Sequence, residues 1–112
     1  MKRLALVFTL AFVFIAHTAF GTNLRGQLVR NINGVYYPLG GVRVDLMVWN
    51  GQSWIDASYA ITGNDGFYFF INCAPNTIFC ISVFGHYYPP QQPLTIQNLA
   101  PQYYQDIPVI ST

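Results

Sequence analysis

Two turn signals enclose a short aromatic run in the middle of the chain, and this arrangement constrains the fold most. Asn64-Asp65-Gly66 combines two residues that tolerate left-handed backbone with one that prefers it, which favours a tight reversal. The residues from Phe67 to Ile71 are aromatic or β-branched, the types that suit a pleated strand. Pro75-Asn76 predicts a second reversal, because proline presets one dihedral angle and asparagine tolerates a positive φ.

The segment after this second reversal has the periodicity of another strand. Phe79, Ile81 and Val83 alternate with Cys80 and Ser82, so that successive side chains fall on opposite faces. The stretch from Thr62 to Val83 therefore predicts turn, strand, turn and strand.

Alternation with a period of two residues recurs along the chain, and no helical period is visible. It is clearest in 42–49, where four aliphatic residues alternate with Arg43, Asp45, Met47 and Trp49. Seven or so short strands separated by turn signals predict an all-β fold, a single seven-stranded β-sandwich. The segments with strand character, one more than the seven strands of the predicted sandwich, lie near 24–28, 35–37, 42–49, 53–61, 67–71, 77–83, 94–97 and 103–110, with 85–93 as a loop. Pro108 cannot donate to a ladder, which favours an edge position for the last strand.

The first 21 residues are typical of a secretory signal peptide. Lys2-Arg3 forms a positive start, Leu4 to Ala16 is apolar except for Thr9, and Ala19-Phe20-Gly21 places small residues before a cleavage point at Thr22. The alternative is an uncleaved membrane anchor, but a spanning helix needs about 20 apolar residues and this run is shorter. We expect cleavage near Gly21, a secreted or periplasmic protein, no integral membrane segment in the mature chain and one domain over 22–112.

The mature region carries little that could support catalysis. It has three arginines, four aspartates and no lysine or glutamate, so there is no basic stripe for nucleic acid. His86 is its only histidine, and no nucleophile–base pair or acid–base pair has a positional signal. Asp65 stands alone as a possible calcium ligand, and an Asx-turn explains it better. We therefore expect no enzyme, no metal and no cofactor.

The central pattern resembles the carboxypeptidase regulatory-like domains of the transthyretin-like and collagen-adhesin B-type sandwiches. The resemblance rests on Thr-x-x-Asp-Gly-x-Tyr-x-Phe from Thr62 to Phe70 and its turn, with Arg25-Gly26-Gln27-Leu28 and Pro38 to Leu46 upstream. Asn76 stands where the family usually has glycine. The resemblance implies a Greek-key, transthyretin-like sandwich, and it implies that Tyr68 and Phe70 point inward. It implies no particular function, since fold alone does not determine one.

The two cysteines flank the second reversal. If Pro75-Asn76 closes a hairpin, Cys73 and Cys80 come within the distance that a disulfide needs, and an exported protein meets an oxidising compartment. The alternative is that they face apart and act as small hydrophobic residues. The first interpretation predicts a Cys73–Cys80 disulfide.

Two sets of aromatic and aliphatic residues are candidate contact sites. With Tyr68 and Phe70 inward, Phe67, Phe69 and Ile71 lie on the other face, where they form either an exposed apolar patch or a surface that the 87–93 loop or the C-terminal segment covers. Trp49, Trp54, Tyr87 and Tyr88 could stack on sugar rings, or could serve as rim packing. We expect a structural, adhesive or protein-interaction role at the cell envelope, with self-association possible. The alternative is a small carbohydrate- or ligand-binding module.

Overall fold

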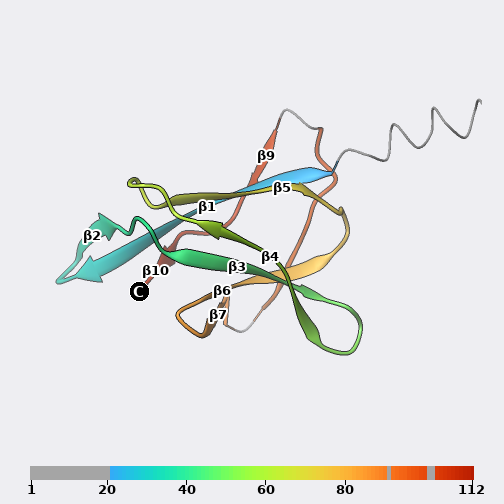
Figure 1. The fold of residues 1–112 in the computed structure, drawn as a ribbon, viewed down its shortest axis with the longest axis horizontal. Helices are drawn as coiled ribbons and strands as arrows, with labels where there is room; N and C mark the ends of the chain where they lie inside the picture. Colours follow the sequence, from blue (N-terminus) through green and yellow to red (C-terminus); the bar gives the residue numbers. More distant parts are fainter. Residues whose placement is uncertain (1–20, 91, 101–102) are drawn as a thin grey trace, which may run out of the picture.

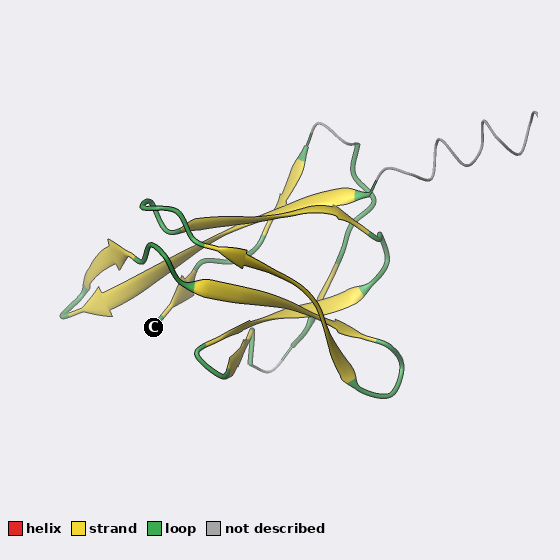
Figure 2. Cartoon of the chain, in the orientation of Figure 1, coloured by secondary structure: helices red, strands yellow, loops and turns green. Residues whose placement is uncertain are grey.

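The computed structural model describes residues 21–90, 92–100 and 103–112, and every regular element within them is a β-strand (Figure 2). The ten strands are β1 (Thr22–Ile32), β2 (Val35–Pro38), β3 (Arg43–Trp49), β4 (Trp54–Ile61), β5 (Phe67–Cys73), β6 (Ile78–Val83), β7 (His86–Tyr88), β8 (Leu94–Thr95), β9 (Tyr104–Asp106) and β10 (Ile110–Ser111). The all-β prediction is confirmed for these residues. The strands outnumber the seven expected, because several segments form pieces of only two or three residues.

The first sheet is organised around the long strand β1. Its N-terminal half pairs with β5 in the antiparallel sense and with β9 in the parallel sense. Its C-terminal half pairs with β2 through the Asn33-Gly34 turn and with β10 in the parallel sense. The β1–β2 hairpin extends beyond the rest of the molecule (Figure 1).

The second sheet has the order β4-β3-β6-β7, and β8 also pairs with β6. Its strands pair in the antiparallel sense throughout. The two sheets lie one above the other in Figure 1, with β1, β5 and β9 in one layer and β3, β4, β6 and β7 in the other.

The core lies between the two layers and takes alternate side chains from each. The inward residues of β3 and β6 are those that the sequence alternation selects, such as Val44, Leu46, Phe79 and Ile81. From β5, Tyr68 and Phe70 point inward as expected, and both are almost fully buried. The buried cluster as a whole consists of Leu24, Leu28, Val44, Leu46, Tyr68, Phe70, Phe79, Ile81, Val83, Ile96, Ile107 and Ile110.

The turn before β5 forms by the mechanism expected from its residues. The Asp65 carboxylate accepts a hydrogen bond of 3.0 Å from the backbone N–H of Phe67, which is an Asx-turn. Gly66 has φ +81°, and a Cβ there would lie 2.4 Å from the carbonyl oxygen of Leu28, so only glycine fits. Asn76 has φ 64°, which confirms that asparagine meets the left-handed requirement at the second reversal.

The pairing after that second reversal differs from the prediction. Pro75-Asn76 does not close a hairpin, because β5 pairs with β1 in one sheet and β6 pairs with β3 in the other. The chain crosses between the layers at this point. The Gly85–Pro93 segment, expected to be a loop, contains β7, which forms a hairpin with β6.

The predicted signal peptide lies outside the described residues except for Gly21. In the part of the chain that the structure describes, there is no helix of the length and apolar character that crossing a membrane requires.

Candidate functional site

The outer face of β5 exposes two of the three residues expected to form an apolar patch. Phe69 is 46% exposed and Ile71 is 62% exposed, whereas Phe67 is half-buried. These side chains lie on the face opposite Tyr68 and Phe70, as expected. The C-terminal segment covers Phe69 only in part, through Tyr104, and Ile71 stays exposed.

The neighbouring strands extend this surface across the sheet. Phe69 is the cross-strand partner of Arg25 on β1, which is in turn the partner of Asp106 on β9. The Tyr104 ring of β9 meets Phe69 edge to face, with the ring centroids 5.8 Å apart. We call Phe67, Phe69, Ile71 and Tyr104 the β5 face. Tyr104 was missed at the level of sequence, because nothing local indicates that β9 returns beside β1.

A charged pair borders the β5 face. The Arg25 guanidinium lies 5.7 Å from the centroid of the Tyr104 ring, and its Nε and Nη2 atoms each lie 2.8 Å from an Asp106 oxygen. The pair is exposed and contributes little to stability. It holds Arg25 beside Tyr104, so the apolar surface has a polar rim, as protein interfaces commonly have.

Three of the four aromatic residues proposed to bind sugar meet on the outer face of the second sheet. The Trp49 and Trp54 ring centroids are 5.4 Å apart, and those of Trp54 and Tyr87 are 6.3 Å apart, both edge to face. Trp49, Trp54, Ile78 and Pro93 line a groove of about 300 Å³. We call Trp49, Trp54 and Tyr87 the tryptophan cluster.

Tyr88 does not belong to the tryptophan cluster. Tyr88 pairs with Ile81, whose side chain points into the core, and Tyr88 packs against that core. Adjacent strand residues point to opposite faces, which sends Tyr87 outward and Tyr88 inward.

Two residues on the outer face of the second sheet are buried. Met47 on β3 and Cys80 on β6 are cross-strand partners, and they are 9% and 2% exposed. Their strands lie between β4, which carries Trp54, and β7, which carries Tyr87.

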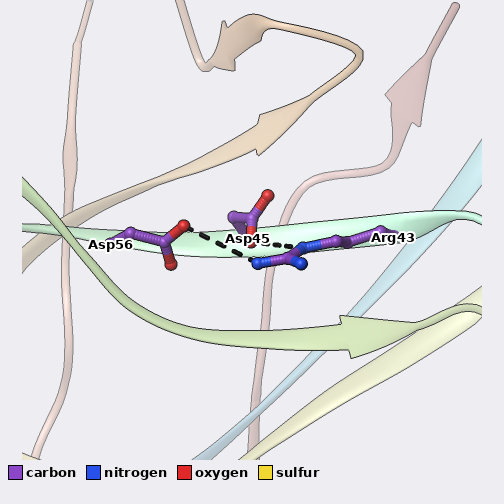
Figure 3. A network of polar contacts seen from close by, with 3 residues as sticks. All are labelled: Arg43, Asp45 and Asp56. Carbon is purple, nitrogen blue, oxygen red and sulfur yellow. Dashed lines mark hydrogen bonds and ion pairs between the residues drawn. The ribbon is translucent and has the colours of Figure 1, made fainter.

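Charged groups lie on the same face, close to the tryptophan cluster. Arg43 Nε donates a 2.9 Å hydrogen bond to Asp45, and Arg43 Nη2 lies 4.0 Å from an Asp56 oxygen (Figure 3). The guanidinium also lies 4.3 Å from the Tyr59 ring centroid. The hydrogen bond to Asp45 raises the pKa of Arg43, which stays charged. Asp56 lies two residues after Trp54, on the same face of β4. Its carboxylate can still accept a hydrogen bond from a ligand.

The predicted Cys73–Cys80 disulfide is not formed, and both cysteines are free. Cys73 packs against the core between the layers, whereas Cys80 lies on the outer face of the second sheet beside Met47. The prediction failed because it assumed a hairpin that the chain does not make. Burial raises the pKa of the Cys73 thiol and raises that of Cys80 to about 11, so both thiols are protonated at neutral pH.

The other chemical groups form no recognisable centre. Among the described residues, no group of three or more histidine, cysteine, aspartate or glutamate side chains could hold a metal ion. His86 is exposed at the start of β7.

Comparison with known proteins adds no assignment. No protein-family model matches the sequence. A search of curated proteins also finds no significant match.

Proposed function

We propose that the chain is an exported, non-catalytic β-sandwich domain that binds a protein partner through the β5 face. In this proposal the sandwich is a carboxypeptidase regulatory-like domain with Greek-key, transthyretin-like topology. The protein is secreted or periplasmic after cleavage near Gly21 and acts at the cell envelope, where a second copy can be the partner.

The observation that supports the proposal is the exposure of Phe69 and Ile71 beside Tyr104. Large apolar side chains gathered on one sheet face, with a charged rim, are typical of a contact surface. Covering such residues with a partner favours binding, because aromatic and aliphatic anchors at the centre of an interface contribute most of the binding energy.

The test is a double substitution on the β5 face. Phe69→Ser with Ile71→Ser is expected to weaken the complex about tenfold or more, since each anchor contributes about 1 kcal/mol or more. The measurement is crosslinking in the native envelope followed by pull-down, with size-exclusion chromatography to detect self-association.

Ile61→Ser is the matched control. Ile61 is 54% exposed on the outer face of the other sheet, so its loss removes an exposed apolar side chain of the same kind as Ile71 without touching the β5 face. The complex is expected to survive this change. If the double variant forms the complex as well as the unchanged protein does, or if no complex is captured, the β5 face is not the binding surface.

The second candidate is a carbohydrate-binding module, and the tryptophan cluster favours it. Trp49 and Trp54 border a groove, and Asp56 supplies an acceptor for a sugar hydroxyl on the same face. Flat aromatic surfaces with few polar groups are typical of small-ligand sites.

Intrinsic fluorescence reports on this groove directly, because Trp49 and Trp54 are the only two tryptophans of the chain. Oligosaccharides selected on a glycan array are expected to change this fluorescence with saturation. Trp54→Ala is expected to weaken their binding about tenfold or more, a loss of about 1.4 kcal/mol. Tyr36→Ala, at an exposed aromatic residue far from the groove, is the control. A protein that self-associates and binds no glycan contradicts this candidate, and a strict monomer with glycan binding favours it.

A further inference from the structure

A cleft of about 390 Å³ opens between the two sheets, on the side where β4 and β5 form the edges. The two strands follow one another through the 62–66 turn and diverge from it (Figure 1). Leu46, Val48 and Ile96 line the cleft from the core side, and Leu46 and Ile96 are almost fully buried. Ile71, Ala57 and Ala74 complete the aliphatic part of the lining. The cleft therefore reaches the interior of the sandwich. It is distinct from the groove at the tryptophan cluster.

A β-bulge lies on each side of the cleft. On β4, Ser58 pairs with Leu46 and Asp56 with Met47, which leaves Ala57 without a partner on β3. On β5, the register shifts between Thr22 and Leu24, where Asn72 has φ 62°. Bulges bend an edge strand and redirect its side chains, and they are frequent beside binding sites. Ala57 and Asn72 both line the cleft, so the two distortions shape the same opening.

The bulge on β5 also changes which way the strand's last residue points. By simple alternation, Cys73 would lie on the outer face with Phe69 and Ile71. It packs against the core instead, half-buried, and lines the cleft. The thiol is therefore a natural reporter inside the cleft.

The lining determines what chemistry the cleft can hold. No charged side chain is part of it, so a ligand charge would find no counter-charge there. Ser58, Asn72 and Thr77 supply hydrogen-bonding groups, and the rest of the lining other than Cys73 is aliphatic. An apolar wall with few polar groups is typical of pockets for small molecules.

We propose that this cleft binds a small uncharged molecule with an apolar body and a hydrogen-bonding group at one end. The apolar body lies against Leu46, Val48 and Ile96, and the polar end faces Ser58, Asn72 or Thr77. The volume sets the size, because a cavity of about 150 Å³ already accommodates benzene. This site is separate from the tryptophan cluster, and Ile71 is the one residue that it shares with the β5 face.

The test uses the neutral fluorophore N-phenyl-1-naphthylamine as the probe. Its fluorescence is expected to rise with saturation at one molecule per chain. Bound probe is expected to slow alkylation of Cys73 by N-ethylmaleimide about tenfold, as read by mass spectrometry in mildly alkaline buffer. Cys80, which is 2% exposed, serves as the internal control, since the probe should not change its reactivity.

A matched pair of serine substitutions locates the probe. Ser58→Trp places an indole in the cleft and is expected to weaken probe binding about tenfold or more. Ser53→Trp adds the same bulk in the loop before β4, outside the cleft, and is expected to leave binding unchanged. Ser58 is exposed, so the fold should tolerate the change, and circular dichroism checks this.

Three outcomes would overturn the proposal. One is the absence of saturable probe binding. The second is binding that Ser58→Trp leaves unchanged, which would place the probe on the β5 face or at the tryptophan cluster. The third is probe binding that leaves the alkylation rate of a reactive Cys73 unaltered.

Discussion

Replacing Gly26 by alanine is expected to destabilise the protein by about 3 kcal/mol, the upper end of the usual cost of overpacking a core. Gly26 lies on the inner face of β1, directly opposite Tyr68 of β5. A Cβ at Gly26 would lie 2.2 Å from both the Cζ and the hydroxyl oxygen of Tyr68. Tyr68 is fully buried, so its ring has no free space to move into. The midpoint and the slope of the urea unfolding transition measure the loss in the free energy of unfolding.

A second substitution tests the cause of that loss. Tyr68→Leu shortens the side chain that the new methyl group meets. In the double variant Gly26→Ala with Tyr68→Leu, the combined cost is expected to be smaller than the sum of the two single costs by about 1 kcal/mol or more. If Gly26→Ala alone changes the free energy of unfolding by less than about 0.5 kcal/mol, as ordinary surface changes do, the close approach of Tyr68 to β1 is wrong.

Truncating Phe79 to alanine is expected to cost about 3–5 kcal/mol, the usual cost for a buried aromatic residue. Phe79, the second residue of β6, is 0% exposed and packs within the buried cluster between the sheets. Its removal loses apolar burial and leaves a cavity that the surrounding strands fill only in part. The free energy of unfolding of a domain is about 5–15 kcal/mol in total. The variant should therefore unfold at a much lower urea concentration or temperature.

Phe69→Ala is the matched control for Phe79→Ala. It removes the same atoms from an exposed position, and its main loss is the edge-to-face contact with Tyr104, about 0.5–1.5 kcal/mol. The two phenylalanines should therefore differ by about 1.5 kcal/mol or more in the free energy of unfolding. Equal effects would contradict the inward and outward placement of these strands.

Much of the local structure could be predicted from the residues themselves. The alternation in 42–49 and 79–83 correctly separates inward from outward side chains on β3 and β6. The turn at Asp65 and Gly66 follows from an Asx-turn and a positive φ, both of which depend on neighbouring residues. These features succeed because side-chain direction and turn geometry are set within a few residues.

The failures concern contacts between distant parts of the chain. The disulfide required β5 and β6 to be neighbours, but β5 lies beside β1 and β6 beside β3. Tyr88 points to the opposite face from Tyr87 because the segment expected to be a loop forms a strand, and its pairing with Ile81 was not visible locally. Cys73 packs against the core because Asn72 takes part in a bulge, which breaks the simple alternation of side chains along β5.

The sequence by itself determined which side chains of the clearest strands point together and where the chain turns, since both follow from period-two geometry and from residues such as Gly66 and Asn76. Only the tertiary structure decided that Phe69 and Ile71 stay uncovered, that Trp49, Trp54 and Tyr87 meet, and that a cleft opens between β4 and β5. The physical reason is that strand pairing and the coverage of a face are non-local. They depend on which segments, far apart in the chain, compete for the same sheet edge and the same apolar surface.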